Sequence, residues 1–336
     1  MQLDLEEGRK LIEAAMISLD HSPQEAAIIS DHLIDCELRG LGYAGLARAV
    51  TIAEYIRNGG LVRGPIELLR ETPVSAHLNG NGTLGYLVAH DATQRAIDKA
   101  SNQGMAVVGA SGTYYTGMFS YYLEMVTKAG LIGMIAGSGP SLVAPYGGTQ
   151  ARLCTNPIAF GFPTDDIPMI WDIGTGIITH AEVVLARRLG QALPEGIAFD
   201  RSGARTTTAA DVLDGGAITN WGGPKGYGLS LSIQLLSMMA GQVNDHSMMA
   251  YPMDCGFFMT VYDPALFGSR ETFREVASSY LDLVADTAPD DPSHPVRVPF
   301  GRSYIEREER RALGVIEVAD EVVAALRGYA PPAVSN

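Results

Sequence analysis

The stretch MAVVGASGTYYTGMFSYYLEMVTKAGLIGMI, residues 105–135, predicts the class of the fold. It opens with the apolar run Met105–Val108 and closes with the run Leu131–Ile135, and each run has the length of a buried strand. The segment between them, Phe119–Ala129, is predicted as a helix. This order of strand, helix and strand is typical of α/β proteins.

The same texture extends from about residue 74 to residue 242. The apolar runs Ile158–Phe162 and Met169–Ile173 are followed by Pro and Gly, and we interpret them as further buried strands. Tyr86–Ala100 is predicted as a helix. The middle of the chain is therefore expected to be an α/β domain.

The first 60 residues predict helices instead. Residues 6–19 carry apolar side chains on one helical face, and Ser22-Pro23-Gln24-Glu25 has the spacing of a capping box with Pro at the first helical position. This second helix is expected to end near Leu38. A third amphipathic helix is expected to end at Gly59-Gly60.

The end of the chain also predicts helices, over Arg270–Ala285 and Glu306–Arg327. We therefore expect residues 1–73 and 265–336 to form a mainly helical domain built from both termini. The α/β domain of residues 74–264 would be inserted between its two parts.

Charge restricts the class of partner. The chain has 336 residues with 38 acidic and 24 basic side chains, which gives a net charge of −14. This charge repels nucleic acid and anionic membrane surfaces, so we expect neither as a partner. An anionic cofactor or substrate would need a local cluster of positive charge or a helix N-terminus inside this acidic protein.

The three cysteines, Cys36, Cys154 and Cys255, lie far apart without CxxC spacing, and we expect reduced thiols. No spacing of His, Asp or Glu suggests a metal site. The first ten residues are acidic and lack an apolar run, and no stretch reaches the roughly 18 apolar residues of a membrane span. We therefore expect a cytoplasmic protein.

Residues Gly80-Asn81-Gly82-Thr83-Leu84-Gly85 match the pattern GxGxxG. A dinucleotide-binding fingerprint also needs an acidic residue at the end of the next strand, to bind the ribose hydroxyls. The strand after this motif ends in Gly109-Ala110-Ser111 and provides none. We interpret the motif as a glycine turn before the helix Tyr86–Ala100.

Segments spread along the chain resemble the malate/L-lactate dehydrogenase family. Residues 38–48, LRGLGYAGLAR, are similar to the family pattern RGxDSHGxxR, and GGPKGYGL at 222–229 is close to GGxKGYGL. Between them, PYGG at 145–148 and TNPIA at 155–159 are similar to PxGG…GTNPIA, and WDIGTG at 171–176 is similar to lDmATS. The ordered agreement covers nearly the whole chain.

The resemblance implies an NADH- or NADPH-dependent oxidoreductase with the family's own, non-Rossmann NAD(P)-binding fold. It also implies a small carboxylate-bearing substrate and a homodimer. The residues that the resemblance places at the cofactor are Ser138, Thr155, Asn156, Pro157, Asp172, Ile173, Gly174 and Lys225.

Several of these residues are also interpretable from their chemistry. Residues 222–228 open an apolar helix, so free backbone N–H groups and the Lys225 ammonium would suit a pyrophosphate, although a flexible loop with a solvated lysine is the alternative. Asn156 would bind a ligand or form a turn with its own backbone. Asp172, at a strand end, would accept a ribose hydroxyl or cap the next glycine turn.

Arg48 lies on the third predicted helix, where the family has an arginine that faces the substrate carboxylate. A guanidinium binds a carboxylate through two parallel hydrogen bonds, which suits a 2-oxo or 2-imino acid. The alternative is a surface arginine on an exposed helix face.

The chain departs from the family at both of its histidines. Tyr43 and Ala44 stand where the family has a Ser-His pair, and Tyr115 stands where it has the histidine taken as the acid/base. An unperturbed phenol has a pKa of about 10, whereas general acid–base help near neutrality is worth roughly 10²–10⁴-fold. A ketone needs a proton as hydride arrives, but an imine that is already an iminium does not.

Three hypotheses remain open. The first is a reductase of imines or 2-imino acids, in which Arg48 binds the carboxylate and Tyr115 or Tyr43 orients the substrate. The second is a 2-oxo acid or 2-hydroxy acid dehydrogenase with Tyr115 as the proton donor. The third is a nucleotide-binding protein without catalysis, because loss of both histidines is also what an inactive relative would show.

Other candidates carry weaker signals. Asp200 matches a family aspartate and would bind a substrate amine or cap a turn. His180, after the lDmATS-like turn, and His246 are the histidines with the best placement for a role at the site, whereas His21, His32, His77 and His294 are expected to be structural or solvated. The methionines at 238, 239, 248, 249 and 253 are expected to fill core more often than to line a pocket.

Overall fold

A seven-stranded sheet forms the centre of the computed structural model, which describes residues 1–60, 63–242 and 255–329. Only β3 and β4 pair in parallel, and all other neighbours are antiparallel. A doubly wound dinucleotide-binding sheet is mostly parallel, so this sheet has a different topology. In spatial order the strands are β2 (Glu67–Thr72), β3 (Ser75–Asn79), β4 (Met105–Thr113), β10 (Cys255–Tyr262), β5 (Ile132–Ser138), β6 (Ile158–Phe162) and β7 (Met169–Ile173).

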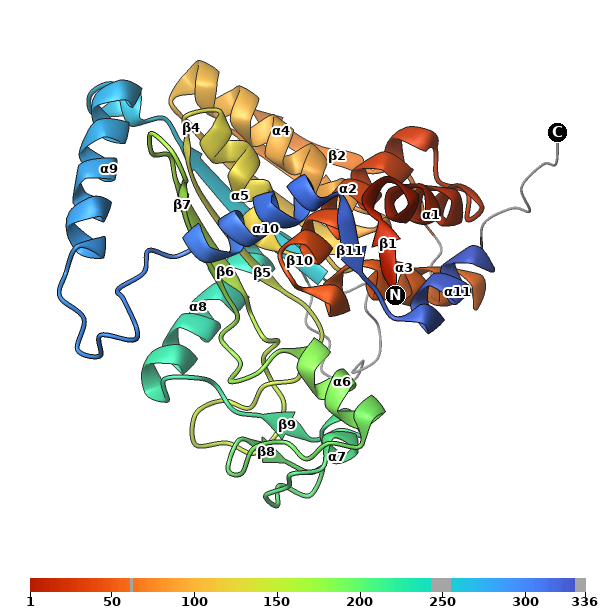
Figure 1. The fold of residues 1–336 in the computed structure, drawn as a ribbon. Coiled ribbons are helices and arrows are strands. Elements are labelled where there is room, and N and C mark those ends of the chain that lie inside the picture. The colour runs from red at the N-terminus through yellow and green to blue at the C-terminus, as the bar shows by residue number, and fades with distance from the viewer. Residues whose placement is uncertain (61–62, 243–254, 330–336) are drawn as a thin grey trace, which may run out of the picture.

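Helices cover both faces of this sheet (Figure 1). The helices α4 (Gly85–Gln103) and α5 (Phe119–Lys128) lie on one face, where alanines of α4 pack against the fully buried Val108 of β4. On the other face α8 (Pro224–Met239) packs Ile233 against Ile158. The predicted strands at 158–162 and 169–173 are confirmed, and so are the helices at 86–100 and 119–129 to within a few residues.

The two ends of the chain meet beside the sheet, where red and blue ribbons lie together in Figure 1. The short strands β1 (Gln2–Asp4) and β11 (Val315–Glu317) pair antiparallel. The helices α1 (Leu5–Ile17), α2 (Pro23–Leu38), α3 (Leu46–Arg57) and α11 (Asp320–Arg327) surround a second apolar core. The capping box at the start of α2 is confirmed, because Ser22 and Glu25 exchange side-chain and backbone hydrogen bonds.

The single helix predicted over Glu306–Arg327 is wrong. The structure has α10 (Gly301–Leu313), then β11, then α11. Gly314 ends α10 in the left-handed conformation, with φ +69°, and Ile316 of the strand that follows is buried opposite Leu3 of β1. Pairing with β1 therefore makes Val315–Glu317 a strand, although their sequence continues a helical pattern.

The sheet begins at Glu67, before the domain boundary expected at residue 74, and the central strand β10 was not among the predicted strands. A small lobe below the sheet in Figure 1 holds α6 (His180–Leu189), α7 (Ala209–Leu213), β8 (Ala198–Phe199) and β9 (Ala217–Ile218). The helix α9 (Arg270–Ala285) extends away from the body on the opposite side from both termini.

The GxGxxG turn lies between β3 and α4, in the only parallel unit of the described sheet. Its glycines are needed for close packing with the chain itself. A Cβ at Gly85 would overlap the carbonyl oxygen of Tyr114, and one at Gly80 would lie 2.9 Å from the carbonyl oxygen of Gly112. Because residues 112–115 occupy the space before α4, the interpretation as a structural turn fits the structure.

A buried ion cluster joins the helical part of the chain to the sheet part. Arg39, the C-cap residue of α2, donates to Asp35 at 2.7 Å and to Glu124 of α5 at 2.8 Å. Arg307 of α10 donates to the same two carboxylates, at 3.1 Å and 2.7 Å. All four side chains are less than a tenth exposed. Burial alone would raise the pKa of Glu124, but the hydrogen bonds and charge of Arg307 lower it.

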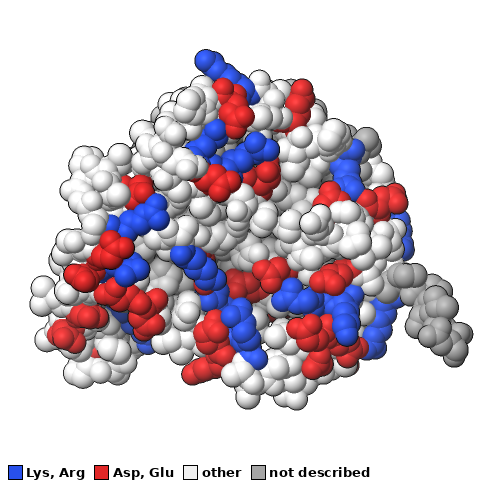
Figure 2. Space-filling view, turned by 90° about the horizontal axis from the view of Figure 1, so that it is seen from above, with Lys and Arg blue, Asp and Glu red and all other residues white. Residues whose placement is uncertain are grey.

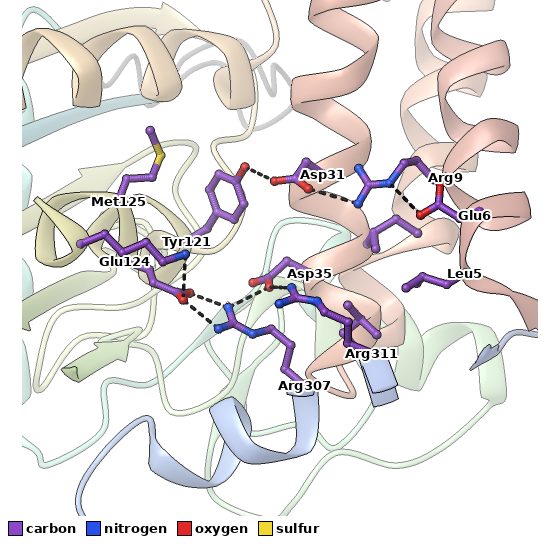
Figure 3. A pocket seen from close by; sticks show the side chains of 13 residues that line it. Leu5, Glu6, Arg9, Asp31, Asp35, Tyr121, Glu124, Met125, Arg307 and Arg311 are labelled. Carbon is purple, nitrogen blue, oxygen red and sulfur yellow. Dashed lines mark hydrogen bonds and ion pairs between the residues drawn. The ribbon is translucent and has the colours of Figure 1, made fainter. Parts of the chain in front are cut away.

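Figure 3 shows three members of this cluster, Asp35, Glu124 and Arg307, in the wall of a polar cavity of about 420 Å³ between α1, α2, α5 and α10. Tyr121 donates to Asp31 at 2.6 Å, and Asp31 also accepts from Arg9 at 3.2 Å. On the outer face seen in Figure 2, acidic and basic side chains are likewise interspersed. Within the described residues, no helix combines the length and the apolar character that crossing a bilayer requires.

We predict that Glu124→Ala destabilises the protein by about 3–5 kcal/mol, because two buried guanidinium groups would lose their shared carboxylate. The measurement is the free energy of unfolding from urea denaturation. Glu7→Ala is the control: it removes the exposed Arg327–Glu7 pair and should cost no more than about 1 kcal/mol. Equal losses in the two variants would contradict the proposed importance of the cluster.

Candidate active site

A cavity of about 550 Å³ lies where α3, α6 and the ends of the central strands meet. It brings together Arg48, Tyr43 and Tyr115, which the sequence predicted as site residues, and Thr155, which it predicted at the cofactor. His180, the first residue of α6, also lines it. Apolar lining comes from residues such as Leu142 and Val184.

The helix α3 presents Arg48 to the cavity. Gly45 stands at the N-cap and offers no side chain, and Glu37 of α2 supplies the cap instead by accepting from Leu46 N at 2.7 Å. A Cβ at Gly45 would overlap the Glu37 carboxylate, so glycine permits this approach. The carboxylate thus fixes the first turn of the helix that carries Arg48.

The Arg48 guanidinium lies over the Tyr115 ring, with Cζ 4.7 Å from the ring centroid. Among the described residues it forms no ion pair, and its buried Nε has no hydrogen-bond partner. The ring supplies only a weak cation–π attraction. Arg48 is therefore a cation at the cavity that retains unused hydrogen-bond donors.

The phenols of this site hold their protons at neutral pH. Burial raises the pKa of Tyr115, against a smaller opposing effect of Arg48, and burial also raises the pKa of Tyr43. The pKa of His180 is lowered, first by lost hydration and then by the charges of Arg48 and Arg187. The imidazole is thus neutral near pH 7, and all three groups are able to donate hydrogen bonds there.

The predicted cofactor residues around Thr155 converge through backbone hydrogen bonds. The Thr155 carbonyl accepts from Thr175 N at 2.7 Å and Thr175 Oγ1 at 3.0 Å. Trp221 Nε1 donates to the Gly174 carbonyl at 2.8 Å, which connects this loop to the residues that precede α8. The segment after β7 and the start of α8 therefore form one surface.

Asn156 and Ser138 both contact α8. Asn156 is fully buried with φ +35°, and its Nδ2 donates to the Ser230 carbonyl at 2.8 Å rather than to its own turn. Its Oδ1 has no partner among the described residues. Ser138 Oγ donates to Gln234 Oε1 at 2.7 Å. Cofactor contact for these two residues stays a prediction, as it does for Pro157, whose carbonyl accepts from Gly137 N, and for Ile173, which packs in the core beneath α8.

Asp172 does not cap the glycine turn that follows it. Its Oδ2 accepts from Ser120 N at 2.8 Å, at the first turn of α5. Burial raises its pKa to about 6, against the lowering effect of this hydrogen bond. The residue therefore stabilises the N-terminus of α5, and its contact with a ribose stays a prediction.

Lys225 is exposed in the first turn of α8, where the N-cap Gly223 supplies no side-chain acceptor. Gly222 and Gly223 have φ of +63° and +57°, and a Cβ at either would meet no atom closer than 3.5 Å. Lys225 forms no salt bridge with any described residue. Free N–H groups beside an unpaired ammonium suit a pyrophosphate, so the residues present fit a dinucleotide.

Asp200 does not line the cavity. Its Oδ1 accepts from Ser202 N, Ser202 Oγ and Ala204 N, which is the turn-capping alternative. His246 and the methionines at 248, 249 and 253 lie outside the described residues. Met238 and Met239 are 40% and 64% exposed, so the expectation that they fill core is wrong. The buried His32 is structural as expected, since its Nε2 accepts from Met118 N.

Sequence reasoning missed several residues that line the cavity. Glu54 of α3 is one of them, and it lies six positions after Arg48, a spacing that does not place two side chains on one helical face. Arg187 and Arg188, in the last turn of α6, also line the cavity. Cys154 and Cys255 do too, although they are 101 positions apart in the sequence and nothing there connects them.

Comparisons with known proteins identify the family of the chain. The profile of the family described as malate/L-lactate dehydrogenase matches residues 3–327. The malate/(S)-sulfolactate dehydrogenase of Methanothermus fervidus is 31% identical, over 98% of this chain and 97% of that protein. The ureidoglycolate dehydrogenase (NAD(+)) of Escherichia coli O157:H7 is 30% identical, over 96% and 94%. A dehydrogenase structure from Sinorhizobium meliloti superposes with a TM-score of 0.89 at 28% identity, covering 98% of both chains.

These matches define the class: the protein is an NAD(P)-dependent oxidoreductase, and relatives act with NAD(+) or with NADP(+). The chain belongs to the malate/L-lactate dehydrogenase family. The hypothesis of a nucleotide-binding protein without catalysis is accordingly not carried further.

We predict that Glu37→Gln makes the free energy of unfolding less dependent on pH. Burial raises the pKa of Glu37 to about 7, so the folded state holds a proton that the unfolded state releases, and the free energy of unfolding falls as pH rises through this range. Gln keeps an acceptor for Leu46 N but cannot ionise. Urea denaturation should show a gain over the wild type near zero at pH 4 that grows to about 3 kcal/mol at pH 8.

Glu317→Gln, on the exposed side of β11, is the matched control and should show a difference that does not change with pH. A constant difference for Glu37→Gln as well would contradict the assignment of this titration to Glu37.

Proposed function

We propose that the protein reduces a small carboxylate-bearing imine, such as a cyclic 2-imino acid, by hydride transfer from NADPH or NADH. Arg48 binds the substrate carboxylate, and Tyr115 and Tyr43 orient the reacting C=N bond. The observation that carries this proposal is the unpaired guanidinium of Arg48 over the Tyr115 ring, in a cavity large enough for a small acid.

Charge supports an anionic substrate. The chain as a whole is acidic, yet the described residues that line the cavity include three arginines, at 48, 187 and 188, and one carboxylate, Glu54. A carboxylate would therefore be attracted to this region of the surface. Two parallel hydrogen bonds from Arg48 would fix its orientation.

Proton supply supports an imine over a ketone. An iminium enters the cavity with its proton, whereas a ketone must receive one as hydride arrives. The pKa of Tyr115 and of Tyr43 is raised and that of His180 is lowered, so none of these groups matches a donor at neutral pH. The Glu54 carboxylate would also stabilise a cationic iminium nitrogen, and no such charge exists on a ketone.

The cofactor supplies hydride from its reduced nicotinamide. Lys225 and the first N–H groups of α8 would hold its phosphates, and the backbone around Thr155 and Gly174 would line its path to the cavity. Because Asn156 and Ser138 are buried beneath α8, they would position that helix.

The alternative function is a 2-oxo acid or 2-hydroxy acid dehydrogenase with Tyr115 as the proton donor. The activities of the relatives in Methanothermus and Escherichia, on malate, sulfolactate and ureidoglycolate, favour it. The same cavity and Arg48 would serve either substrate, and only the source of the proton differs.

Turnover measurements distinguish the two. We predict oxidation of NADPH or NADH with cyclic imino acids and little with 2-oxo acids, a KM raised roughly 10–100-fold in Arg48→Lys, and a kcat lowered less than about 10-fold in Tyr115→Phe. Arg297→Lys, in the loop before α10, is the matched control for replacing a guanidinium with an ammonium group at constant charge. Turnover of pyruvate or oxaloacetate without any imine, with kcat lowered about 100-fold or more in Tyr115→Phe, would support the alternative.

We also propose a cytoplasmic homodimer, in which α9 contributes to the contact between subunits. None of the residues of α9 is buried, and Val276, Tyr280 and Leu283 lie on one helical face with 64%, 64% and 68% exposure. Phe267, just before the helix, is 99% exposed. A contiguous apolar face of this kind is typical of an interface. The three cysteines are thiols, which suits a reducing compartment.

We predict that the double variant Val276→Asp and Leu283→Asp halves the molar mass in solution, because charges would be buried in the contact. Size-exclusion chromatography with light scattering measures the change. Glu275→Ala, on the polar face of the same helix, should leave the mass unchanged. An unaltered mass in the double variant would place the contact elsewhere.

A further inference from the structure

Two thiols from distant parts of the chain meet in the wall of the cavity. Cys154 precedes β6 and Cys255 is the first residue of β10, and both are half-buried. The reference point is Gly139, directly after β5: a Cβ there would lie 2.9 Å from the Cys255 sulfur and 3.6 Å from the Cys154 sulfur. Both sulfurs therefore lie within 3.6 Å of one point.

Backbone hydrogen bonds of the sheet keep the segments that carry the two cysteines close together. Gly256 pairs with Ser138 across β10 and β5, and the Pro157 carbonyl accepts from Gly137 N, so the three segments are fixed to one another by backbone hydrogen bonds. Any side chain larger than glycine at 139 would press on the Cys255 sulfur. Gly139 thus permits the approach of the two thiols.

The neighbours limit what the pair would bind. Among the described residues, no three His, Cys, Asp or Glu side chains are grouped as a metal site, so a tetrahedral zinc centre has too few ligands. Two thiols alone suit a soft acceptor that takes two sulfur ligands. Burial raises the pKa of Cys154, so the reaction of its thiolate with oxidants is slow. Ligand exchange, in which the thiol gives up its proton as a bond to sulfur forms, is still permitted.

We propose that Cys154 and Cys255 form a dithiol site for trivalent arsenicals and similar soft thiophiles, placed so that its occupant obstructs the cavity of Arg48 and Tyr115. With a hydrated aryl arsenical, two As–OH bonds and two S–H bonds break, two As–S bonds form, and two waters leave without any change of oxidation state. The expected loss of turnover rests on the proposed function, whereas the binding does not.

The test uses the whole protein and phenylarsine oxide. Mass spectrometry should show one phenylarsenic group per chain, and thiol titration of the native protein should lose two thiols. The adduct should survive 2-mercaptoethanol and be removed by 2,3-dimercaptopropanol. Cys154→Ser and Cys255→Ser should each need at least about 100-fold more reagent, because one sulfur loses the advantage of two linked ligands.

Two further variants make the test specific. Cys36→Ser is the matched control, because Cys36 is fully buried on α2 outside the cavity, and it should keep the adduct. Gly139→Ala keeps all three thiols but displaces the Cys255 sulfur, so it should weaken binding about 10-fold or more. Circular dichroism confirms that each variant is folded.

An adduct that resists 2-mercaptoethanol in both single serine variants, or none in the wild type, would overturn the proposal. An adduct that forms as expected but leaves NAD(P)H-dependent turnover unchanged would uphold the dithiol site and would instead contradict the placement of the substrate in this cavity.

Discussion

Four buried charged side chains at the junction of α2, α5 and α10 join the helical part of the chain to the sheet part. Arg39 and Arg307 each share Asp35 and Glu124, so every charge is compensated twice. Such a cluster adds little to the free energy of unfolding relative to apolar packing, but removal of one of its members is strongly destabilising. Because α2 also supplies Glu37 to cap α3, and α5 begins against Asp172, the cluster sets the frame on which both sides of the cavity are built.

The chemistry of the cavity follows from where charge is compensated and where it is not. Arg39 and Arg307 are paired with carboxylates, whereas Arg48 has an aromatic ring beneath it and no ion-pair partner among the described residues. The resemblance implies that Ala44 and Tyr115 stand where the family has histidines, and burial raises the pKa of the phenols Tyr43 and Tyr115. A site of this kind orients and recognises an anion well, but it supplies protons poorly, which is why the proposed substrate carries its own.

Local patterns predicted most of the elements, because they depend on neighbours in the sequence. The capping box at Ser22, the strands at 158–162 and 169–173 and the helix at 270–285 are examples. The misses depend on distant partners. Ile316 leaves a helical pattern to pair with Leu3, and β10 is central only because β4 and β5 lie on either side of it.

The same distinction applies to the site. Arg48, Tyr43, Tyr115 and Thr155, which the motifs predicted as site residues, line one cavity, but the motifs did not indicate that Asp172 caps α5 or that Asn156 is enclosed beneath α8. Sequence patterns did not indicate Glu54, Cys154, Cys255 or the α6 arginines, since only the folded chain brings them to the same wall.

The pairing of β1 with β11 has a consequence for synthesis of the protein. Leu3 pairs with Ile316, more than 300 positions later, and Asp35 of α2 contacts Arg307, 272 positions later. On the ribosome the N-terminal helices therefore emerge with an incomplete core, while the inserted sheet is able to assemble before them. The helices α1 and α2 are thus among the last elements of this fold to acquire their full set of contacts.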